Sequence, residues 1–108
     1  MTLLQQRDLR RVRDRERART VTRDRLRQVV RRLLPDQRVW VFGSLCREGD
    51  FGMTSDVDIA IEVLPEGKSL YMLHSEFEEL LGRPIDVVLL PESRLREKIL
   101  RDGELWMP

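Results

Sequence analysis

Apolar residues recur three and four positions apart in three stretches of the chain, a spacing that predicts helices. The first stretch covers residues 22–34, where Thr22 is the expected N-cap and Pro35 follows the last apolar residue. The other two cover residues 70–81 and 95–102, and a glycine follows each of them. We therefore predict three helices.

Three short runs are instead rich in β-branched and aromatic residues, and they predict strands. They lie at 38–42 (RVWVF), 56–62 (DVDIAIE) and 84–90 (PIDVVLL), and residues 105–106 are expected to add a short final strand. The resulting order of helix, strand, strand, helix, strand, helix predicts an α/β (α+β) domain. In such a domain the helices pack against a small mixed sheet.

The first 20 residues are arginine-rich, and their apolar residues are sparse. They could extend the first helix, form a separate helix or remain mobile. Residues 1–32 hold twelve arginines against four acids, a balance of +8, whereas residues 33–108 carry −7. We therefore divide the chain into an Arg-rich arm at 1–21 and a domain at 22–108. The arm could contact nucleic acid or an acidic partner, but a solvated helix with internal ion pairs has the same composition and is preferred.

The overall composition narrows the class of protein. A chain of 108 residues with 36% charged and 41% hydrophobic residues fits one globular domain. No apolar run reaches the roughly 20 residues of a membrane helix, so we expect a cytoplasmic protein without membrane contact. Cys46 and His74 are the only cysteine and histidine, which excludes an internal disulfide and disfavours structural zinc. Both are interpreted as ordinary surface or packing residues.

Two acids in the second predicted strand are candidates for chemistry. Asp56 and Asp58 are two residues apart, so their side chains project from one face of the strand about 7 Å apart. Adjacent carboxylates raise each other's pKa unless a cation lies between them. Magnesium prefers a few carboxylate oxygens together with water and substrate phosphates. The alternative is that both acids simply lie at the exposed start of a strand.

Asp86 strengthens the first interpretation, because it lies within the most apolar run of the chain and needs a partner there. That partner could be a basic residue such as Arg83 or Arg38. Otherwise Asp86 joins Asp56 and Asp58 around a pair of metal ions, an arrangement used for in-line displacement at phosphorus. In that case Asp86 would act as a metal ligand or as a base.

Gly43 and Ser44 follow the first predicted strand directly. A glycine there lets the backbone approach a phosphate, and the serine that follows can donate its hydroxyl and its N–H. Arg47, in the loop after them, could stabilise a triphosphate, although a loop arginine can equally be only solvated.

In combination, these motifs resemble one family. VFGS at 41–44, TSDVDI at 54–59 and RPIDVV at 83–88 are similar to the minimal nucleotidyltransferases of the DNA polymerase β superfamily, and most similar to the antitoxin partners of HEPN-domain toxins. The resemblance implies a polymerase-β-like palm fold, two Mg²⁺ ions at Asp56, Asp58 and Asp86, and nucleotide phosphates at Gly43 and Ser44. The loop at 45–55 is one residue longer than is usual in the family.

The resemblance also implies a function. In this family the antitoxin transfers AMP from ATP to a tyrosine of its HEPN ribonuclease partner, a protein AMPylation that silences the toxin. Two alternatives stay open: an antitoxin that acts by binding alone, and a transferase for RNA or a small molecule in which the arm engages nucleic acid. A homodimer and a hetero-oligomer with the toxin are both compatible with the sequence.

Overall fold

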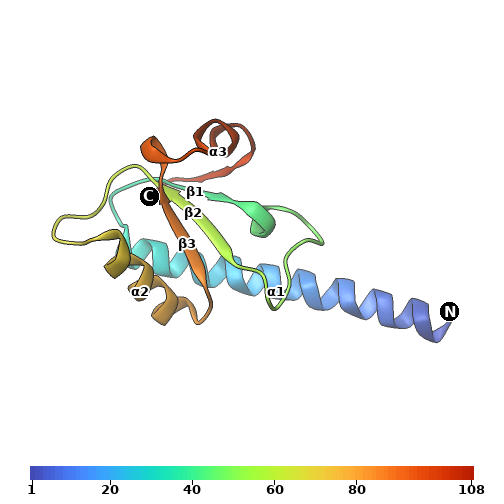
Figure 1. Cartoon of the computed structure of the whole chain (residues 1–108). Helices are drawn as coiled ribbons and strands as arrows, with labels where there is room; N and C mark the ends of the chain where they lie inside the picture. Colours follow the sequence, from blue (N-terminus) through green and yellow to red (C-terminus); the bar gives the residue numbers. More distant parts are fainter.

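The computed structural model describes residues 1–108 as three α-helices and a four-stranded sheet, with two short 3₁₀ turns, η1 and η2 (Figure 1). The elements follow the predicted order, and the final strand is present. Their bounds are α1 Leu3–Leu33, β1 Val39–Phe42, η1 Gly43–Cys46, β2 Val57–Ile61, α2 Leu70–Leu81, β3 Ile85–Leu89, η2 Leu90–Glu92, α3 Arg96–Asp102 and β4 Glu104–Trp106.

Of the three alternatives for the first 20 residues, the structure shows that they extend the first helix, which runs from Leu3 to Leu33. It begins at Leu3, where the Thr2 side chain accepts a hydrogen bond from the Gln5 backbone N–H and the Gln5 side chain accepts one from Thr2. The prediction that Thr22 is the N-cap is wrong: Thr22 lies within α1 and is buried. Residues 3–20 contain neither Gly nor Pro and are rich in Arg, Leu and Gln, which are good helix formers, so nothing stops the helix upstream.

The sheet is mixed, with strand order β3-β2-β1-β4. β1 pairs antiparallel with both β2 and β4, while β2 pairs parallel with β3. The parallel pair requires a crossover, which α2 supplies. That helix begins at Ser69, whose hydroxyl accepts a hydrogen bond from Met72 N–H at 3.1 Å, and ends at Gly82 in the left-handed conformation.

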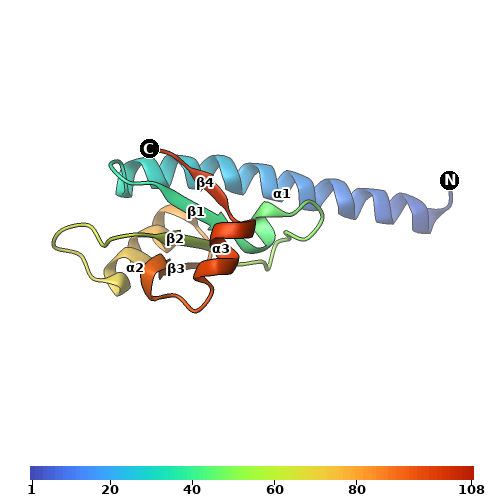
Figure 2. The same ribbon diagram turned by 90° about the horizontal axis from the view of Figure 1, so that it is seen from above.

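The helices cover the two faces of the sheet unequally. α1 and α2 lie on one face and α3 lies alone on the other, as the two views together show (Figures 1 and 2). The larger core fills the first face, and a small cluster of Trp40, Ala60, Leu90 and Ile99 lies under α3. The sheet surface that α3 leaves uncovered is therefore available for a site.

The N-terminal half of α1 projects beyond the sheet (Figure 2). Apart from Glu16, Ala18 and Arg19, its residues up to 21 are exposed, and the chain measures 56 × 29 × 21 Å along its principal axes. Arg15 and Arg19 tie its base to the domain by donating to the carbonyl oxygens of Gly49 and Leu45. No helix of the chain is both long enough and apolar enough to span a membrane.

Candidate active site

Gly43 turns the chain out of β1 with a φ of 75°, a conformation that glycine adopts without strain. A second constraint acts at the same position. A Cβ atom added there would lie 2.4 Å from Oδ2 of Asp58, far inside van der Waals contact. The Gly43 backbone and the Asp58 carboxylate are thus immediate neighbours, although 15 positions separate them in the chain.

Pairing between the strands brings two of the three predicted acids side by side. Asp58 of β2 is the register partner of Asp86 in the parallel strand β3, and on its other side it is the partner of Phe42 in β1. Register partners project from the same face of a sheet. Since Val57 and Ile59 are fully buried on the opposite side, the row Asp86, Asp58 and Phe42 lies on the face that carries α3.

Asp56 directly precedes β2, at the end of a loop that Arg83 holds in place. Arg83 donates hydrogen bonds to the carbonyl oxygens of Gly52 and Ser55, at 3.3 and 3.1 Å, and its guanidinium lies 4.6 Å from the centroid of the buried Phe51 ring. These contacts hold in place the loop that leads into the strand carrying Asp58.

The electrostatics of this row centre on Asp58. Burial, followed by the charges of Asp86 and Asp56, raises the pKa of its carboxyl from 3.8 to about 6, and Arg47 opposes the rise. The other two acids therefore both act on the half-buried carboxylate of Asp58. At neutral pH this group is ionised at an electrostatic cost that a cation would relieve.

The three carboxylates fit magnesium only in part. They do not form a ready cluster of three metal-ligating side chains. Magnesium needs no such cage, because it keeps several waters and is usually held by one or two carboxylates plus substrate phosphates. Asp58 and Asp86, adjacent on one exposed sheet face, supply such a pair, and Asp56 lies at the entrance to the same strand.

Asp86 does not pair with either of the basic residues suggested as an alternative. Arg38 pairs with Glu62, and Arg83 donates its hydrogen bonds to carbonyl oxygens of the loop before β2. The basic group nearest to Asp86 is His74 of α2, whose Nε2 lies 3.7 Å from Asp86 Oδ1 and accepts a hydrogen bond of 2.7 Å from Val87 N–H. The interpretation of His74 as an ordinary packing residue overlooked this contact, which depends on how α2 packs against β3.

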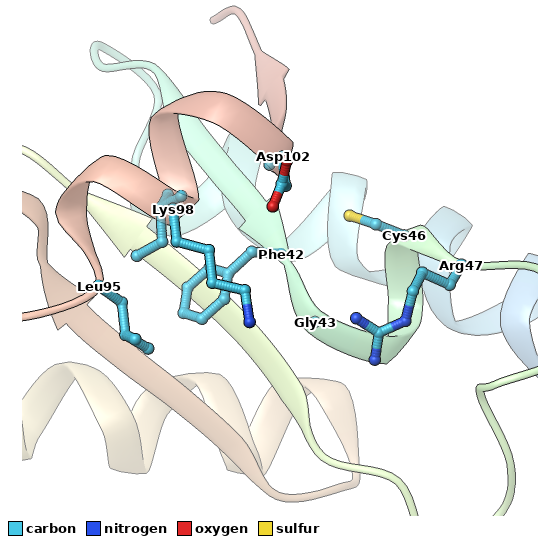
Figure 3. Close-up of a pocket in the computed structure, with 9 residues that line it drawn as sticks. Phe42, Gly43, Cys46, Arg47, Leu95, Lys98 and Asp102 are labelled. Atoms are coloured by element: carbon cyan, nitrogen blue, oxygen red, sulfur yellow. The ribbon is translucent and has the colours of Figure 1, made fainter.

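A cleft of about 260 Å³ opens beside Gly43, between η1 and α3 (Figure 3). Arg47 points into it from the end of η1 while also pairing with Asp50 at 2.6 Å. Ser44 lies within η1 but does not line this cleft. Sequence reasoning missed the contribution of α3 altogether. The cleft is lined by Phe42, Gly43, Cys46, Arg47, Leu95, Lys98, Ile99, Asp102 and Gly103.

Cys46 also borders the cleft. Its thiol donates a hydrogen bond to the carbonyl oxygen of Val41 at 2.9 Å. Burial raises the pKa of this thiol, which disfavours the reactive thiolate. This geometry agrees with the interpretation of Cys46 as a packing residue.

Comparison with known proteins identifies the fold. The chain is 30% identical to a solved structure described as a minimal nucleotidyltransferase, with a TM-score of 0.63 over 80% of this chain and 93% of the other. It also shares its fold with a chain from a crystal structure of a toxin-antitoxin with AMP-PNP, at 22% identity and a TM-score of 0.62, covering 79% and 73% of the two chains. No curated protein matches the sequence significantly.

The family model for the nucleotidyltransferase domain matches residues 23–105. This span includes β1, β2, β3, all of β4 except Trp106, the Gly43 turn and all three candidate acids. The chain therefore belongs to the nucleotidyltransferase domain family and has the minimal form of its fold.

Proposed function

We propose that this nucleotidyltransferase is a magnesium-dependent antitoxin, a cytoplasmic protein that transfers AMP from ATP to a tyrosine of a HEPN ribonuclease toxin. One observation carries the catalytic part of the proposal: Asp58 and Asp86 are register partners on the open sheet face, directly beside the Gly43 turn. Such a pair of carboxylates next to a close-approach glycine suits the phosphates of a metal-bound nucleotide.

The residues take separate roles in this reaction. Asp56, Asp58 and Asp86 would hold two Mg²⁺ ions, which supply charge stabilisation at the α-phosphate and favour the ionised acceptor hydroxyl. Gly43 would let the backbone approach the phosphates closely, and Ser44 would donate hydrogen bonds to them. Arg47 would neutralise phosphate charge.

The transfer itself forms a bond between the tyrosine oxygen and the α-phosphorus while the bond to pyrophosphate breaks. The tyrosine proton must leave as this bond forms. Asp86 lies on the far side of Asp58 from the Gly43 turn, so it would face an acceptor arriving from the open β3 side. There it would serve as a metal ligand or take the proton.

The projecting arm at 1–21 gives the proposed partner a surface to bind, while residues 22–108 carry the transferase site. Leu3, Leu4 and Val12 are 75%, 71% and 60% exposed, interspersed with arginines. Apolar side chains in such exposed positions suit a protein surface better than nucleic acid, and the arm has no aromatic residue on which a base could stack. The fold is shared with a chain from a toxin-antitoxin structure, which supports a toxin as the partner.

The proposal is tested by incubating the protein with ATP, magnesium and a HEPN-domain toxin, taken from a neighbouring gene where one is present, and measuring the intact mass of that partner. We expect added AMP with the wild type and none with Asp56→Ala combined with Asp58→Ala. No added mass with the wild type, or equal transfer by the double variant, would refute the enzymatic role.

A second candidate is an antitoxin that neutralises its toxin by binding alone. One observation favours it: the arm is extended and exposed, so it could cover a surface of the toxin. The same double variant separates the two functions. If it suppresses toxin activity as well as the wild type does, binding is sufficient; if suppression is lost while the complex still forms, catalysis is required.

A further inference from the structure

The cleft between η1 and α3 contains a cation that neither the sequence motifs nor the proposed roles use. Lys98 lies on α3, and its side chain reaches down from the helix toward Phe42 and Gly43 (Figure 3). It is exposed and takes part in none of the ion pairs or side-chain hydrogen bonds of the structure.

Lys98 faces a second cation across the turn. The Arg47 guanidinium projects from the end of η1 toward the Lys98 ammonium, with Gly43 between them (Figure 3). Arg47 also pairs with Asp50, which does not line the cleft, whereas Lys98 has no acidic partner. Two cations directed at the same space favour an anion between them. The only acid lining the cleft is Asp102, whose carboxylate is engaged by Arg101.

The position of the cleft indicates on which side of Asp58 the leaving group would depart. Along the row of register partners, Asp86 lies on one side of Asp58 and Phe42 lies on the other. The cleft begins at Phe42 and Gly43, so it extends the row on the side away from Asp86. If the acceptor arrives at Asp86, the leaving group must depart in line on the opposite side, toward Lys98.

We propose that Lys98, together with Arg47, binds the β- and γ-phosphates of the nucleotide and holds the departing pyrophosphate in the cleft between η1 and α3. This inference rests on the proposed nucleotide transfer and adds the element that receives the leaving group. A lysine suits the task because its ammonium acts as a mobile point charge that can follow the pyrophosphate as it separates.

The assignment is tested by equilibrium binding, for example by calorimetry, of AMP, ADP, ATP and pyrophosphate in the presence of Mg²⁺. For Lys98→Gln we expect about a tenfold to a hundredfold loss of affinity for ATP and for pyrophosphate, the value of a charge-assisted hydrogen bond. The affinity for AMP should not change, since AMP lacks both phosphates. Lys98→Arg should retain most of the wild-type affinity.

A matched control is available on the same helix. Arg96 is an exposed cation of α3 that does not line the cleft, so Arg96→Gln removes the same charge from the protein without touching the site. Equal ATP affinity in Lys98→Gln and the wild type would overturn the inference, as would an equal loss for AMP or an equal effect of Arg96→Gln. None of these three results contradicts the proposed function, provided that the wild type binds MgATP. A wild type that binds no nucleotide contradicts the proposed function and the Lys98 assignment together.

Discussion

The negative charge of Asp58, which the candidate site would use to bind a cation, destabilises the folded state. Its carboxyl is half-buried beside Asp86 and Asp56, and its pKa is raised from 3.8 to about 6. Ionisation of this group therefore costs the folded state more than the unfolded one. Asp58→Asn removes the charge while keeping the shape of the side chain next to Gly43, so we expect this variant to be more stable than the wild type at pH 8 without metal.

The size of the gain follows from the two pKa values. Each pH unit corresponds to 1.36 kcal/mol, so the interval from 3.8 to about 6 sets an upper limit of about 3 kcal/mol. Solvent screens roughly half of this free energy at a half-exposed carboxylate, which leaves a stabilisation of about 1.5 kcal/mol for Asp58→Asn. For a domain of this length, that corresponds to a rise of about 8 °C in the thermal midpoint.

The sign of the pH dependence is fixed by the raised pKa. Between pH 3.8 and about 6 the folded state holds the Asp58 proton and the unfolded state has lost it, so this group lowers wild-type stability as pH rises through that window. The advantage of Asp58→Asn should therefore be close to zero at pH 4 and complete by pH 7.

Thermal and urea unfolding at pH 4 and pH 8 in metal-free buffer measure this difference. Asp36→Asn, which removes an exposed carboxylate outside the site, is the control for the change in net charge. If Asp58→Asn is neutral or destabilising at pH 8, or if Asp36→Asn gives the same gain, the electrostatic reasoning is refuted.

Three further outcomes are expected. Gly43→Ala should destabilise the fold by about 1–3 kcal/mol in urea unfolding, because its Cβ meets Asp58 and its φ is positive; an unchanged midpoint would contradict this geometry. Phe77→Ala, in the fully buried core, should cost about 3–5 kcal/mol, and a loss below 1 kcal/mol would show that the α2 packing is wrong. Thr2→Ala should increase amide exchange in the first turns of α1, because it removes the helix cap on the exposed arm. The global free energy of unfolding should stay within about 0.5 kcal/mol of the wild type. A larger loss of global stability would mean that the arm folds as part of the core.

The sequence predicts the sheet well because each strand has its own local signal. The alternation from Asp56 to Glu62 identifies β2 and shows which of its residues face the core, and Val57 and Ile59 are indeed fully buried. The glycine after α2 marks its end correctly. For α1 the local signal fails, because the apolar stripe begins only where the helix first contacts the core, whereas the helix itself begins 19 residues before Thr22, at Leu3.

Features of the site that depend on tertiary packing could not be predicted from local sequence signals. The common face of Asp58 and Asp86 follows from the parallel register of β2 and β3, which the motif order suggests but does not determine. The contact of His74 with Asp86 and the entry of Lys98 into the cleft depend on how α2 and α3 lie against the sheet. Neither residue carries a local motif, since each resembles any polar residue on a surface helix.

The shared cation site is tested most directly by a crystal structure of the protein with Mn²⁺ and a non-hydrolysable ATP analogue. Manganese gives an anomalous signal, so the metal can be located independently of the phosphates. We expect metal bound between Asp58 and Asp86, with Asp56 as a further ligand and the triphosphate against Gly43 and Ser44. Metal and nucleotide bound elsewhere, with the Asp58 and Asp86 carboxylates free, would contradict the site.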